Sequence, residues 1–197
     1  MERRELLRWL TATAGLAALE GLAPEDLLAL GRDVHVRAAS AGGSVLGQTA
    51  SRTVILAAER ILPASDTPGA TDAGVVGFID RMLADWFDAN EREGFLNGLP
   101  ELDRRSRSRA GRDFADCSGA DQVAVLTALD EELTALRRAG RGGEANRHWF
   151  GMLKYLTVYG YFTSEPAARN TLRTYPHPGR FDGCAPYPAP ASTPTRP

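Results

Sequence analysis

Residues 144–162 read EANRHWFGMLKYLTVYGYF, and as a helix this stretch is apolar on nearly every side. A helix that is apolar all round is buried, either inside its own domain or against another protein. Tyr and Trp are also the residues that dominate interface hot spots. The core interpretation suits the helix as a whole, while its aromatic residues are candidates for a partner interface. These candidates are Trp149, Tyr155, Tyr159 and Tyr161.

Working outward from this stretch, the rest of the chain predicts further helices. Apolar residues recur at helical spacing from Thr49 to Leu62, where Pro63 stops the run. Asp72 is placed to cap a second helix, and glycines at 94–98 predict a break before a polar helix lined with arginine. The expected helical segments are 49–62, 72–87, 99–114, 118–136, 144–162 and a short piece at 167–172. Because no alternating runs bounded by hairpin turns are present, we predict a single all-α domain of about five helices over residues 49–174.

Composition and charge limit the class of protein. The chain has 197 residues, of which 43% are hydrophobic and 24% charged, as in a soluble globular protein with one domain. The formal net charge is -2, so the chain lacks the excess of positive charge that is typical of nucleic-acid-binding proteins. The arginines at 104, 105, 107, 109 and 112 are therefore interpreted as a solvated stripe around Asp103 and Asp113.

The N-terminal segment, residues 1–22, resembles a twin-arginine export signal. The pattern is Arg3-Arg4-x-Leu6-Leu7, followed by an apolar stretch that is shorter than the ~20 residues needed to span a bilayer. The alternative interpretation is a surface amphipathic helix that begins with arginines. No clear small-x-small cleavage site follows, so both removal and retention of the segment stay open.

Two further segments are expected to lie outside the helices. Residues 23–48 are rich in Ala, Gly and Ser and predict a flexible linker. Residues 175–197 contain several prolines without periodicity and predict an extended C-terminal arm. The arm carries Tyr175, Phe181 and Tyr187, which we expect to contact a partner because the arm has no core of its own.

In an oxidising compartment, cysteines such as Cys117 and Cys184 can form disulfides. We predict a disulfide from Cys184, on the arm, to a partner protein. An internal Cys117–Cys184 bridge and two free thiols are the alternatives.

Motifs for catalysis, metals or cofactors are missing from the sequence. His35, His148 and His177 have no ligands at metal-binding spacing, and no Cys-x-x-Cys, Gly-x-Gly-x-x-Gly or Walker pattern is present. Ser164 begins a helix-start pattern rather than a nucleophile elbow. We therefore expect a protein without catalytic, cofactor-binding or metal-binding residues.

Four blocks of sequence, in order along residues 49–187, resemble the gluconate 2-dehydrogenase subunit 3 family. The blocks are Ile61-Leu-Pro-Ala-Ser-Asp-Thr-Pro-Gly-Ala70; Gly74-Val with Phe78-Ile-Asp80; Leu153-Lys-x-Leu-Thr157 with Gly160-Tyr-Phe-Thr-Ser-Glu165; and Tyr175-Pro-x-Pro-Gly179 with Gly183-Cys184. The resemblance implies a small, often twin-arginine-tagged subunit of a bacterial membrane-bound sugar or sugar-acid dehydrogenase. It implies a large FAD-binding catalytic subunit as partner, frequently with a multihaem cytochrome c, and it carries over no catalytic residues.

The expected function is that of a non-catalytic subunit in the periplasm, associated with the cytoplasmic membrane through its partners. There it would support folding, export and stability of the flavoprotein. The same sequence features also fit an alternative function, that of a transient export chaperone that releases its client. A self-sufficient enzyme is a third hypothesis and would require a polar cleft that the sequence does not indicate.

Overall fold

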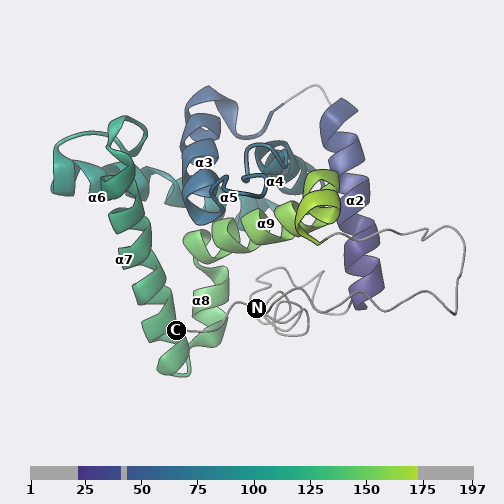
Figure 1. Cartoon of the computed structure of the whole chain (residues 1–197). Coiled ribbons are helices and arrows are strands. Elements are labelled where there is room, and N and C mark those ends of the chain that lie inside the picture. Colours follow the sequence, from purple (N-terminus) through teal and green to yellow (C-terminus); the bar gives the residue numbers. More distant parts are fainter. Residues whose placement is uncertain (1–21, 41–43, 173–197) are drawn as a thin grey trace, which may run out of the picture.

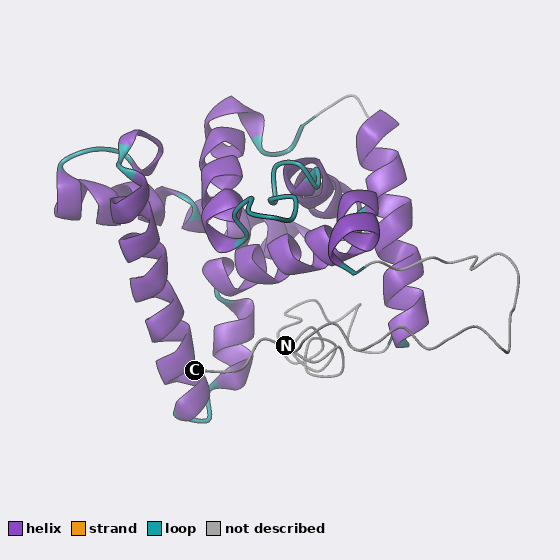
Figure 2. Ribbon diagram, in the orientation of Figure 1, coloured by secondary structure: helices purple, strands orange, loops and turns teal. Residues whose placement is uncertain are grey.

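The computed structural model describes residues 22–40 and 44–172, and every regular element within them is helical (Figures 1 and 2). The all-α prediction is confirmed, with eight α-helices in this part of the chain where about five were expected. They are α2 (Pro24–Ser40), α3 (Gly47–Ile61), α4 (Val75–Asp85), α5 (Ala89–Gly98), α6 (Pro100–Ala110), α7 (Gly119–Arg138), α8 (Gly142–Arg147) and α9 (Trp149–Thr163). A 3₁₀ turn, η1 (Phe114–Asp116), and a π turn, η2 (Ala167–Thr171), complete the set.

Helix α9 is the centre of the fold, as its all-round apolar sequence requires. Helices α2, α3, α4, α5, α7 and α8 and the turn η2 all pack against it. The side chains of Trp149, Tyr155, Tyr159 and Tyr161 are only 7%, 2%, 2% and 3% exposed. The core interpretation is therefore correct for this helix, and the assignment of these four residues to a partner interface is corrected. The chain itself supplies enough neighbours to cover every face.

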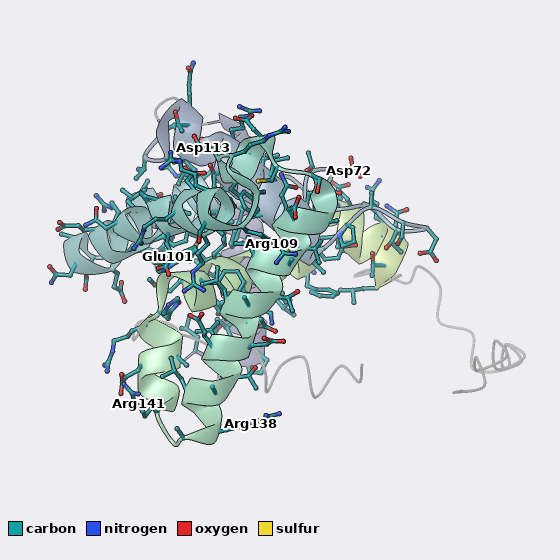
Figure 3. All side chains as sticks on the ribbon, turned by 90° about the vertical axis from the view of Figure 1, so that its left-hand side faces the viewer. Asp72, Glu101, Arg109, Asp113, Arg138 and Arg141 are labelled. Atoms are coloured by element: carbon teal, nitrogen blue, oxygen red, sulfur yellow. The ribbon has the colours of Figure 1, made fainter. Side chains whose placement is uncertain are left out.

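The predicted helix over 144–162 is two helices that meet at His148. His148 has extended backbone angles, and its Nδ1 accepts a hydrogen bond from the backbone N–H of Phe150 at 3.2 Å, which caps α9. Gly151 lets α8 approach closely, because a Cβ there would lie 2.5 Å from the carbonyl oxygen of Ala145. Helices α7 and α8 form a hairpin with Arg138 and Arg141 at its tip (Figure 3).

The prediction of a flexible linker over 23–48 is wrong for Pro24–Ser40, which form helix α2. This helix packs on α4 and α9. Leu27 and Val34 are buried at a spacing of two helical turns, and Gly31 between them lies against Thr163. The apolar stripe of α2 is narrow, so the composition of this segment resembles that of a linker. The helix packs against α9 because Gly31 at the contact allows a close approach.

Helix caps account for most remaining differences from the sequence prediction. Asp88 and Glu91 form a capping box, so α5 runs straight through Gly94 to Gly98, where a break was expected. Asp72 accepts from the backbone of Gly69 and does not cap α4. The arginine stripe on α6 is largely ion-paired at the surface, for example between Arg107 and Asp113.

Candidate partner-binding surface

The loop over residues 62–74, here called the motif loop, crosses the surface between α3 and α4. Figure 2 shows it in teal between α3 and the C-terminal end of α9. Pro63 and Pro68 prevent continuation of the helix and favour turns. The residues at its outer edge, Ala64, Ser65 and Asp66, are exposed. Residues 63–66 of the motif therefore face solvent, while Gly69 and Ala70 are buried.

Glu59, in the last turns of α3, holds the motif loop through one carboxylate. Its Oε1 accepts from the backbone N–H of Ala64 at 3.0 Å. Its Oε2 accepts from the backbone N–H of Thr71 at 3.0 Å and from the Thr71 hydroxyl at 2.7 Å. Burial alone would raise the pKa of Glu59, but these hydrogen bonds and the nearby charge of Arg60 outweigh burial and hold the pKa below its ordinary value. Both ends of the loop are thus tied to one ionised group.

The loop is also closed by its own backbone. Ala70 N–H donates to the carbonyl of Leu62 at 2.9 Å, and Ser65 N–H donates to that of Thr67 at 3.0 Å. Gly69 suits its position because a Cβ would lie 2.7 Å from the backbone nitrogen of Ala64, as well as 2.5 Å from Oε1 of Glu59. Gly74, at φ 68°, ends the loop in a left-handed conformation that glycine adopts without strain.

Tyr161 ties the motif loop to the turn η2 at the end of α9. Its hydroxyl lies 2.8 Å from the carbonyl oxygen of Pro68 and 2.8 Å from Oγ1 of Thr171. A carbonyl only accepts, so the single phenolic proton goes to Pro68, and the Thr171 hydroxyl donates to the tyrosine oxygen. Tyr161 was predicted to contact a partner directly; instead, it fixes the loop that faces solvent.

The turn η2 brings the end of the described chain to the same surface. Ser164 begins the turn, since its hydroxyl accepts from Ala167 N–H at 3.2 Å, as its helix-start pattern predicted. Leu172, the last described residue, is 39% exposed. Through Tyr161 and Thr171 the motif loop and the turn η2 form one surface, which we call the loop platform. A conformationally fixed, exposed loop of this kind is suited to recognition.

Other residues of the family motifs hold helices together inside the domain. Asp80, on α4, accepts from the backbone N–H groups of Val45 and Leu46, each at 2.9 Å, just before α3. Gly160 packs against the ring of Phe78, where a Cβ would lie 2.7 Å from the ring. These motif residues build the scaffold that positions the loop platform.

The polar cluster around His148 links α6, α7 and α9. Arg105 donates to Glu101 and to Glu132, with its shortest contact to each at 2.6 Å, and Trp149 Nε1 donates to Glu101 at 3.3 Å. Burial lowers the pKa of His148, although the two carboxylates oppose this effect. The cluster resembles a structural ion-pair network, because its charged groups satisfy one another.

The remaining predicted site residues divide between the surface and the undescribed segments. Cys117 is half-buried with its thiol 3.7 Å from the carbonyl of Arg112, and it is free among the described residues. The export-signal residues and the arm residues lie outside the described part of the chain: Arg3, Arg4, Leu6, Leu7, Tyr175, His177, Phe181, Cys184 and Tyr187. Sequence reasoning did not identify Glu59, although its position just before a motif rich in turn residues is a usable signal.

Residues 22–40 and 44–172 contain neither a metal-binding cluster nor a membrane-spanning helix. No group of three or more His, Cys, Asp or Glu side chains in them is arranged to hold a metal ion. No helix in them is long and apolar enough to cross a membrane.

Fold and surface together define a small all-helical domain with an exposed loop that hydrogen bonds hold in place. The family model of gluconate 2-dehydrogenase subunit 3 matches residues 48–179, and the chain belongs to this family. The match confirms the resemblance seen in the sequence motifs and covers α3 to η2, so helix α2 lies outside it. The family's name describes a subunit of a dehydrogenase complex. No curated protein and no solved structure matched the chain.

Proposed function

We propose that this chain is the non-catalytic small subunit of a periplasmic flavin-dependent dehydrogenase that oxidises a sugar or sugar acid. In this role it supports folding, twin-arginine export and stability of a large FAD-binding catalytic subunit. A multihaem cytochrome c is a further candidate partner. FAD and haem reside on these partners, and the complex meets the membrane through them.

Family membership, together with the geometry of the loop platform, supports this proposal. A motif that is exposed and yet held by Glu59 and Tyr161 binds a partner without first having to become ordered. The platform includes the turn η2, and Leu172, directly after this turn, is exposed. Recognition of another protein is therefore the role that the arrangement supports best.

Affinity purification of the tagged full-length chain from the native envelope tests the proposed complex. We expect copurification of a large flavoprotein, with a flavin absorption spectrum and with dehydrogenase activity in the complex. The chain purified alone should be colourless and inactive. A stoichiometric flavin or metal on the isolated chain, or the recovery of the chain without a flavoprotein, would contradict the proposal.

The export role needs a separate experiment. Replacing Arg3 and Arg4 together by Lys should leave both the chain and its flavoprotein in the cytoplasm, provided that the flavoprotein has no signal of its own. Undiminished periplasmic dehydrogenase activity in this variant would show that the arginine pair is not the export signal.

A further inference from the structure

An open cleft at the end of α3, next to the first residue of the motif loop, is lined by residues of α3, α7 and α9. Figure 1 labels these three helices. Its volume is about 220 Å³. The lining residues are Arg60, Ile61, Val123, Leu126, Thr127, Asp130, Phe150 and Lys154. Small-molecule sites are typically about 300–1,000 Å³, so this cleft is better matched to one or two side chains of a protein.

The inner part of the cleft is apolar. Phe150 and Leu126 are 1% and 6% exposed and form the floor, whereas Val123 is 46% exposed at the edge. Val123 is one of the few large apolar side chains that the described surface exposes to this extent. A cleft with a dry floor and an exposed apolar edge gains free energy when a partner's apolar side chain fills it.

The rim of the cleft carries two cations and one carboxylate. Lys154 Nζ lies 2.5 Å from Oδ1 of Asp130, so these two charges compensate each other. Arg60 is exposed, and its Nε donates to the neutral amide of Gln122 at 2.9 Å. Within the described residues no carboxylate forms an ion pair with Arg60. The Arg60 charge acts on Glu59 at longer range, but its guanidinium has no ion-pair partner among the described residues, and its planar fork suits a carboxylate.

We infer that this cleft binds a segment of the flavoprotein subunit that places an apolar side chain on the Phe150 floor and a carboxylate against Arg60. The inference rests on the proposed function and names the chemistry of the contact. The cleft adjoins the loop platform, which supports this occupant. Ile61 lines the cleft and is also the first residue of the family motif that leads into the platform. One partner can therefore cover the platform and the cleft together.

Binding of the purified flavoprotein to full-length variants tests the inference. Val123→Asp places a carboxylate at the apolar edge, and Arg60→Glu reverses the charge at the rim. The matched controls are Ile55→Asp, at an exposed apolar position on α3 outside the cleft, and Arg104→Glu, at an exposed arginine on α6. We expect each cleft variant to raise Kd at least tenfold, and each control to leave Kd within about twofold of wild type. The effect of Arg60→Glu should shrink at high salt.

Two additional measurements separate binding from folding. Circular dichroism melting should show that the variants fold, and hydrogen exchange of the wild-type complex should show protection of amides over residues 123–130. If wild type binds the flavoprotein but both cleft variants bind equally well and residues 123–130 gain no protection, the inference is overturned and the proposed function stands. If wild type fails to bind the flavoprotein, the proposed function fails, and the inference fails with it.

Discussion

Replacing Glu59 by Gln tests whether one carboxylate holds the motif loop. The carboxylate accepts three hydrogen bonds, two at one oxygen and one at the other. Gln has one acceptor oxygen and one NH₂ donor, so at least one bond is lost and two N–H groups then face each other. A hydrogen bond to a charged group contributes about 1.5–3 kcal/mol, and solvent at this exposed loop lowers the expected loss to about 1–2 kcal/mol.

Amide hydrogen exchange measures this loss directly. A decrease of about 1–2 kcal/mol in the free energy of loop opening corresponds to roughly 5–30-fold faster exchange, expected at Ala64 and Thr71. Glu93→Gln is the matched control, because Glu93 is exposed on α5 with a single long side-chain contact at 3.4 Å. Unchanged exchange at both amides in Glu59→Gln would refute the role assigned to this carboxylate.

The same variant predicts a change in pH dependence. Because the folded-state pKa of Glu59 is below its ordinary value, its contribution to loop stability is complete above the unfolded pKa of about 4.3 and is lost as pH falls through the folded value. Wild-type exchange at the loop should therefore accelerate below about pH 4 after correction for intrinsic rates. Glu59→Gln should not show this acid step.

Three further predictions concern the core, a histidine and the arm. Gly160→Ala places a Cβ 2.7 Å from the buried Phe78 ring and should destabilise the domain by about 1–3 kcal/mol in urea unfolding; an unchanged midpoint would mean that the ring moves freely. Burial lowers the pKa of His35 despite its hydrogen bond to Gly160, so stability should fall as pH drops below about 6.5. In His35→Gln, stability should fall less as the pH drops, and the remaining decrease is due to His148. An unchanged pH dependence of stability would contradict this prediction. Truncation after Leu172 should weaken flavoprotein binding and leave the helical circular dichroism signal intact; loss of that signal would show that the arm is part of the fold.

The spacing of apolar residues, together with proline and helix-capping residues, was sufficient to predict the helical class and several helix ends. Pro63 ends α3 within two residues of its last helical residue, and Ser118 caps α7 through Asp121, because proline geometry and capping hydrogen bonds act locally. The family motifs were likewise readable without a structure, and the family match confirms them. These features depend on residues that are close together in the chain, so they can be predicted from the sequence alone.

Tertiary packing decided where the aromatic residues of α9 and the residues before Thr49 lie. An all-round apolar helix can be covered by its own domain or by a partner, and only the packing of α2 and the other helices shows that the domain covers it. The narrow stripe of Leu27 and Val34 stabilises a helix only because α4 and α9 provide a surface for it. Glu59 and Tyr161 acquire their roles through contacts with Thr71 and Pro68, at sequence separations of 12 and 93 residues. Local sequence patterns do not encode such separations, because a hydrogen bond between distant residues exists only after the chain has folded.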